Sequence, residues 1–213
     1  MMSFLLPFCS GFALSASLIV AIGAQNLFVL RQGLKQEHVG MIVLFCGFSD
    51  AVLIIAGVSG MGAVVAALPT LTVGFTLAGA VFLAWYGTQS LRRAAQHGSM
   101  SVELGQSVSL KRALATVAAF TWLNPHVYLD TVLLMGAAAT AQPLSARPIF
   151  AVGAASASFL WFAALGYGAR FLQPVFARPR AWQVFDCIIG GVMFVLAGFL
   201  LWSGAFHQFL KQE

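Results

Sequence analysis

The chain has 213 residues, of which 60% are hydrophobic and only 8% are charged. About a quarter of the residues in soluble domains are charged, so this composition excludes a water-soluble fold. The formal net charge of +5 would suggest a nucleic-acid partner for a soluble protein, but here the basic residues lie between apolar runs, where they act as membrane topology signals. We therefore expect an all-α membrane protein in a lipid bilayer, with no nucleic-acid partner.

The apolar runs predict six transmembrane helices, because each span needs about 20 apolar residues. The first run is too long for the apolar region of a signal peptide and no basic segment precedes it, so we expect it to be retained as a helix. The chain, residues 1–213, is then one transmembrane domain. The predicted helices cover residues 4–30, 39–60, 68–91, 113–138, 147–171 and 183–209.

Basic residues concentrate in the connections after the first, third and fifth predicted helices. The opposite side has only Arg147 and Lys211. Because Lys and Arg are enriched in cytoplasmic loops, both termini should face outward. The nine residues on the basic side are Arg31, Lys35, Arg92, Arg93, Lys111, Arg112, Arg170, Arg178 and Arg180.

The two halves of the chain, roughly residues 1–91 and 113–213, share a short pattern. Phe-Leu-x-Trp-x-Gly occurs at residues 82–87 and again at residues 199–204. Three helices per half is an odd number, so the halves would enter the membrane in opposite directions. This predicts two inverted three-helix repeats, an arrangement found in many secondary transporters. The alternative is a chance match of interfacial aromatic and small packing residues.

The first predicted helix contains adjacent amides, Gln25 and Asn26, close to its basic end. Amides in an apolar run need hydrogen-bond partners, and Gly23 permits a local helix break or a close helix approach. We interpret Gln25 and Asn26 as candidate substrate-binding residues, with interhelical hydrogen bonding as the alternative.

Asp50 lies about eleven residues into the second predicted helix, near mid-bilayer. An Asp at the centre of a span costs about 2.5–3.5 kcal/mol on insertion scales and usually faces a cavity or a partner. The functional interpretation is binding of a cationic substrate or a proton. The alternative is a protonated carboxyl group bonded to a neighbouring helix.

The fourth predicted helix contains the most polar stretch within any span, from Thr121 to Asp130. In the inverted-repeat interpretation, Asn124 occupies the place related to that of Asn26, so it is a candidate binding residue as well. Pro125 cannot continue a straight helix, so we expect a break there. If the helix resumes after the proline, His126 and Asp130 share one face and are candidates for substrate binding or proton relay. A proline kink with an internally satisfied His–Asp pair is the alternative.

Weaker candidates for a pathway are Tyr128, Ser156 and Trp161, for which packing is the alternative. We interpret Asp186, which follows Arg178 and Arg180, as an interfacial charge. The sequence has no cysteine pair, no metal-ligand spacing and no nucleophile beside a base. We therefore expect no metal, no cofactor and no enzymatic activity.

These motifs resemble the LysE superfamily of amino-acid exporters, and within it the branch that exports basic amino acids. Ala24 stands where the family usually has Pro, which implies a milder break in the first helix, and the acidic insertion of some relatives is absent. The resemblance rests on Gly23-x-Gln25-Asn26 followed by Arg31-Gln32-Gly33, on Ser49-Asp50, on Thr121 to Asp130, and on Ala155 to Phe162.

The resemblance implies export of L-arginine or L-lysine across the bacterial cytoplasmic (inner) membrane, driven by the proton motive force as an antiport with protons. Asp50 and Asp130 fall on the intramembrane aspartates of the family. The alternative within the superfamily is a neutral substrate of the homoserine or threonine type. Small residues such as Gly190 and Gly191 permit close helix packing within one chain or in a homo-oligomer.

Overall fold

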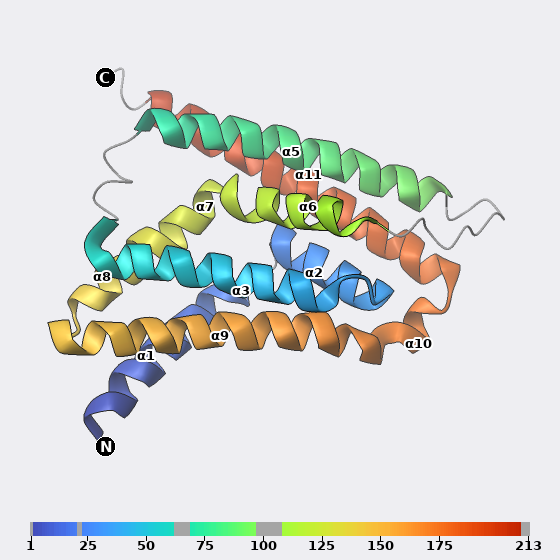
Figure 1. The fold of residues 1–213 in the computed structure, drawn as a ribbon. Helices are drawn as coiled ribbons and strands as arrows, with labels where there is room; N and C mark the ends of the chain where they lie inside the picture. Colours follow the sequence, from blue (N-terminus) through green and yellow to red (C-terminus); the bar gives the residue numbers. More distant parts are fainter. Residues whose placement is uncertain (1, 21–22, 62–68, 97–107, 210–213) are drawn as a thin grey trace.

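The computed structural model describes residues 2–20, 23–61, 69–96 and 108–209, and every regular element in these ranges is a helix (Figure 1). The predicted all-α class is confirmed for this part of the chain. The elements are α1 (Met2–Ile19), α2 (Ala24–Lys35), α3 (Val39–Ala56), η1 (Gly57–Met61), α5 (Pro69–Gln96), α6 (Leu110–Trp122), α7 (Pro125–Val127), η2 (Tyr128–Leu134), α8 (Met135–Thr140), η3 (Leu144–Ala146), α9 (Arg147–Gly168), η4 (Ala169–Leu172), α10 (Gln173–Phe176) and α11 (Pro179–Phe209).

Within the described ranges, three helical stretches are long and apolar enough to cross a bilayer. They are Val39–Gly60, Leu144–Phe176 and Pro179–Trp202, and the bent pair of Phe4–Ile19 and Ala24–Lys35 would add a fourth. The outer surface is apolar as well, since large side chains such as Leu6 and Val195 are 75% and 70% exposed. Several apolar helices with an apolar exterior identify a multi-pass membrane protein.

The first predicted helix is wrong as one continuous span, because the structure divides it into α1 and α2, whose axes differ by 84°. Gly23 has an extended backbone (φ −119°, ψ 167°) and is the N-cap of α2. The side chain of Asn26 donates a hydrogen bond to the carbonyl oxygen of Ile19, at 2.8 Å, and so satisfies a carbonyl in the last turn of α1. The break between α1 and α2 is therefore complete, and the milder break expected from Ala24 in place of the usual proline of the family is not seen.

A second break separates α6 from α7, directly before Pro125. Asn124 is extended (φ −91°, ψ 108°), and its side-chain oxygen accepts a hydrogen bond from the backbone N–H of His126 at 3.1 Å. The hydroxyl of Tyr128 donates to the carbonyl oxygen of Trp122 at 2.8 Å. Side chains thus replace backbone hydrogen bonds that the proline interrupts, as broken backbone within a membrane requires. The chain then continues as the π-helix η2 and as α8.

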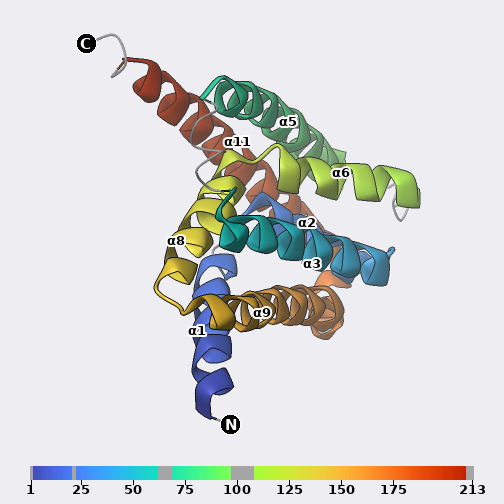
Figure 2. The same ribbon diagram turned by 60° about the vertical axis from the view of Figure 1, so that its left-hand side comes forward.

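Two helix contacts organise the rest of the fold. α5 and α11 lie side by side along most of their length, and α9 packs against α1, α2 and α3 (Figures 1 and 2). The crossing of α1 and α9 depends on two glycines without side chains. A Cβ atom on Gly11 would collide with the backbone of Phe150, and one on Gly153 would collide with the backbone of Phe8.

The basic connections of the chain meet at one end of the molecule. The end of α2, the end of α5, the start of α6 and the turn from α10 to α11 all lie on the right in Figure 1. We call this the basic end.

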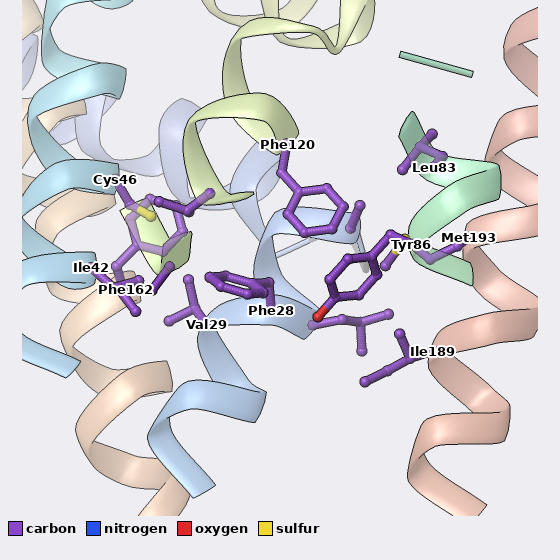
Figure 3. Close-up of a cluster of buried hydrophobic side chains, with 14 of the residues drawn as sticks. Phe28, Val29, Ile42, Cys46, Leu83, Tyr86, Phe120, Phe162, Ile189 and Met193 are labelled. Atoms are coloured by element: carbon purple, nitrogen blue, oxygen red, sulfur yellow. The ribbon is translucent and has the colours of Figure 1, made fainter. Parts of the chain in front are cut away.

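The larger of two buried apolar clusters lies between α3 on one side and the α5–α11 pair on the other. Phe28 of α2, Tyr86 of α5 and Phe120 of α6 meet at its centre (Figure 3). Their ring centroids are 4.9 to 6.2 Å apart, and all three side chains are buried.

Candidate functional site

A cavity of about 240 Å³ lies where the two broken helices meet. It is smaller than the roughly 300–1,000 Å³ of drug-sized ligand sites, so it suits a small solute. Its polar lining comes from the α1–α2 break, from α3, from the α6–α7 break with η2, and from α9. The polar residues on its wall are Ser15, Gln25, Asn26, Asp50, Asn124, His126, Asp130, Thr131 and Ser158.

Asp50 reaches the cavity wall from the middle of α3. It is 9% exposed, and the hydroxyl of Ser158 on α9 lies beside it. Ser158 in turn is 3.5 Å from the hydroxyl of Ser15 on α1. Three helices therefore bring hydroxyl groups and a carboxyl group to one part of the cavity.

His126 and Asp130 reach the cavity from the helix that begins at Pro125. The imidazole of His126 stacks against Phe199 of α11, with ring centroids 5.4 Å apart, and Asp130 is exposed. Two carboxyl groups, Asp50 and Asp130, thus line one cavity, while no Lys or Arg is among the described residues on its wall. The wall is formally acidic, which favours a cation inside it.

The amides of the two breaks have structural contacts as well as places on the wall. Asn26 donates to Ile19 and accepts a hydrogen bond from the indole N–H of Trp161, with Nε1 3.3 Å from Oδ1. Asn124 caps α7, and Gln25 and Gly23 line the cavity beside Asn26. Both α2 and the helix from Pro125 begin at the cavity, so the positive ends of two helix dipoles face it.

Comparison with known proteins places these residues within a family. A sequence model of the LysE type translocators matches residues 16–204, which include nearly all of the cavity wall. The chain belongs to this family. It is 41% identical over 191 residues to the "Arginine exporter protein ArgO" of Yersinia enterocolitica, covering 89% of this chain and 93% of that protein. It is 39% identical over 202 residues to the protein of the same name from Salmonella newport, covering 93% and 94%. No solved structure matches the chain.

Four of the predicted site residues in this family member lie off the cavity wall. Tyr128 stacks on Phe75 and donates a hydrogen bond to the carbonyl oxygen of Trp122, and Trp161 is connected to the site by its hydrogen bond to Asn26. Ser156 donates a hydrogen bond to the carbonyl oxygen of Val152 in its own helix, at 2.7 Å. Pro125 starts α7 without lining the cavity.

Sequence reasoning missed two features. Ser15 lines the cavity but was not singled out, because a serine beside alanine and leucine looks like a packing residue in a sequence. Ser158, which the sequence favoured as a packing residue with a pathway role as the alternative, also lines the cavity. The interpretation of Asp186 as an interfacial charge is wrong, because its side chain is 0% exposed and pairs with Arg31 and Arg93. The sequence did contain a signal for this ion-pair cluster: Asp186 lies next to the apolar run of the last helix, and Arg31 and Arg93 lie near the ends of two other helices.

Proposed function

We propose that this protein is a secondary active exporter of basic L-amino acids, arginine or lysine, and that the substrate occupies the cavity between the two broken helices. The observation that carries the proposal is the acidic wall, with Asp50 and Asp130 on it and no Lys or Arg among the described lining residues. The names of the ArgO relatives, at 39–41% identity, support arginine as a substrate.

Charge complementarity explains why carboxyl groups serve this substrate. A guanidinium or ammonium group that leaves water loses its hydration, and a carboxylate in the cavity replaces that interaction with a charge-assisted hydrogen bond. Asp50, Asp130 and the neighbouring serine hydroxyls would bind the side chain of the substrate. A neutral amino acid has no cation on its side chain to place beside these carboxylates, which selects against it.

The other end of the amino acid carries a carboxylate, for which the start of α2 is suited. α2 begins at the cavity with Gly23 as N-cap and without a side-chain cap, so the N–H groups of its first turn face the cavity. Helix N-termini bind anions through these groups and through the helix dipole. The structure thus supports binding of the substrate carboxylate near Gly23 and Gln25, with the cationic side chain toward the aspartates.

Coupling to protons would use the same acidic groups. A carboxyl group in the cavity is neutralised either by a proton or by the cationic substrate, so the two can alternate. His126 and Asp130, four residues apart on the same helix, would pass protons to or from the cavity. This gives antiport of a basic amino acid and protons.

We further propose that six spans form two inverted three-helix repeats in one domain, residues 1–213. In this proposal the α1–α2 break corresponds to the α6–α7 break, α3 corresponds to α9, and α5 corresponds to α11. The helices α5 and α11 also contact each other. The basic end would face the cytoplasm and both termini the outside of the inner membrane. Rocking of the repeats would expose the cavity to each side in turn.

The test is flux of labelled arginine, lysine and threonine in proteoliposomes with an imposed pH gradient. Asp50→Asn and Asp130→Asn should each raise the arginine concentration for half-maximal flux roughly 10–100-fold, because a hydrogen bond to a charged group is worth about 1.5–3 kcal/mol. The matched control is Ser156→Ala, which should leave flux unchanged. Ser156 belongs to α9, a helix that lines the cavity, but its hydroxyl is hydrogen-bonded within that helix.

Two results would contradict the proposal. Wild-type protein that is folded and transports neither arginine nor lysine is not a basic amino-acid exporter. Threonine flux that is retained in both aspartate variants would instead indicate the neutral-substrate branch.

A further inference from the structure

A cluster of three charged side chains, of which Arg31 and Asp186 are buried and Arg93 is partly buried, lies outside the cavity. The carboxylate of Asp186 in α11 binds Arg31 of α2 through two contacts, Nε to Oδ1 and Nη2 to Oδ2, both 3.3 Å. It also accepts a hydrogen bond from Nε of Arg93 in α5 at 3.3 Å. One carboxylate therefore joins three helices.

The cluster lies on the side of the cavity that faces the basic end. On α5 the cavity is lined by Leu83, and Arg93 follows ten residues later toward the basic end. On α11 it is lined by Leu196, and Asp186 precedes it by ten residues. At 1.5 Å per residue, both positions are about 15 Å from the cavity wall.

An aromatic layer, Phe28, Tyr86 and Phe120 (Figure 3), lies between the cavity and the charged cluster. Phe120 lines the cavity and packs against Tyr86 and Phe28, with ring centroids 4.9 and 5.7 Å away. The same layer contacts the charged cluster, because the centre of the Tyr86 ring lies 5.5 Å from the guanidinium carbon of Arg93. A solute leaving the cavity in this direction would first meet an apolar layer and then the ion pairs.

The cluster also opposes a cation electrostatically. Two guanidinium groups and one carboxylate have a formal net charge of +1. A positively charged solute on the far side of the aromatic layer is repelled by this charge, and burial reduces the screening of that repulsion. The closed cluster therefore blocks cations by both steric and electrostatic means.

The two ion pairs differ in which parts of the fold they connect. Arg93 and Asp186 belong to α5 and α11, which pack along each other, so this pair lies within one unit. Arg31 belongs to α2, which packs mainly on α9. Among the described residues, the Arg31–Asp186 pair is thus the ion pair that joins α2, and with it α9, to the α5–α11 unit. When it separates, Asp186 keeps Arg93 as a partner, so the buried carboxylate is not left unpaired.

We propose that the Arg31–Asp186 ion pair, with the aromatic layer of Phe28, Tyr86 and Phe120, is the gate that closes the cavity toward the basic end. This inference rests on the proposed transport function. The gate opens when α2 moves away from the α5–α11 unit, and Arg93 holds Asp186 in place during the movement.

The gate can be measured without any substrate. A reporter cysteine, Ala119→Cys, would line the cavity in a chain whose Cys9, Cys46 and Cys187 are replaced by Ala. Membrane vesicles of both orientations are treated with a membrane-impermeant maleimide, and the labelling rate from each face is compared. Arg31→Gln should raise the rate from the basic end at least about tenfold by shifting the population toward the open state. The rate from the opposite face should not rise.

Arg93→Gln is the matched control, since it removes an arginine from the same carboxylate but leaves the connection to α2. It should not raise labelling from the basic end. Equal labelling rates in Arg31→Gln and the parent would overturn the gate. An increase in labelling from both faces, or an equal increase in Arg93→Gln, would overturn it as well, because either result indicates that the whole fold is destabilised. Arginine flux measured on the same samples tests the proposed function separately, since the labelling result does not depend on what the cavity carries.

Discussion

Trp161 of α9 holds Asn26 of α2 by a hydrogen bond from the indole N–H to the amide oxygen, at 3.3 Å. Asn26 uses its amide N–H to satisfy Ile19 at the end of α1. The helix break in the first half of the chain is thus fixed by a residue of the second half. This relationship makes Trp161 a positioning residue for the cavity, although its own side chain is off the wall.

Trp161→Phe keeps an aromatic ring and removes the hydrogen bond to Asn26. The variant should lose about 0.5–1.5 kcal/mol of stability, the net value of one hydrogen bond, and should transport more slowly. Thermal unfolding in detergent and flux in proteoliposomes measure the two effects. Trp202→Phe, at a tryptophan that is 69% exposed and off the cavity wall, serves as the control. Equal flux in the Trp161 variant and the parent would contradict the positioning role.

Ala24→Pro should be tolerated or stabilising. Position 24 is the first residue of α2, where the backbone N–H has no partner within the helix, and Gly23 before it has the extended conformation that a following proline favours. Proline at this position reduces the conformational entropy of the unfolded chain, which stabilises the folded protein by about 0.4–1 kcal/mol. The unfolding temperature should stay the same or rise. A clear fall would show that the buried Ala24 side chain leaves no space for the proline ring.

Gly153→Ala should separate α1 from α9. The added Cβ would collide with the backbone of Phe8, and backbone cannot move aside as a side chain can, so a cost of about 1–3 kcal/mol is expected. Gly191→Ala in α11 is the control, because a Cβ atom there meets nothing within 4 Å. Yield of folded protein and unfolding temperature distinguish the two variants. The prediction fails if both behave alike.

His126→Gln should uncouple transport from the pH gradient. Glutamine retains hydrogen-bonding groups at the cavity wall but cannot take up a proton near neutral pH. Exchange of labelled for unlabelled arginine should continue within about threefold of the parent rate, which is under 1 kcal/mol, while gradient-driven accumulation is lost. His38→Gln, whose ring contacts the carbonyl oxygen of Val108 away from the cavity, should keep its response to the gradient. Retained coupling in the His126 variant would assign proton transfer to other residues.

The sequence predicted the helical class and most helix positions because apolar runs are strong signals in a membrane protein. The second predicted helix, 39–60, corresponds to α3 with η1, and the fifth, 147–171, to α9 with η4. Pro125 marks its break locally through the missing N–H. Intramembrane Asp50 and Asp130 are conspicuous because charge is costly in lipid.

What the sequence did not predict depends on contacts between distant segments. The 84° bend between α1 and α2 is stabilised by Asn26 and Trp161, which are 135 residues apart. Asp186 pairs with Arg31 across 155 residues, so no local pattern announces a buried ion pair. Arg31 and Arg93 were read as topology signals alone, because their burial is a property of the assembled helices.

The dependence of the first break on Trp161 has a consequence for biosynthesis. When the ribosome has made only α1 to α5, the amide oxygen of Asn26 lacks its indole donor, and Gly11 lacks the α9 backbone against which it packs. The amino-terminal segments would therefore insert into the bilayer first and acquire their final shape only after α9 has been synthesised. A chain truncated before residue 147 should be recognised by membrane proteases as incomplete, however apolar its helices are.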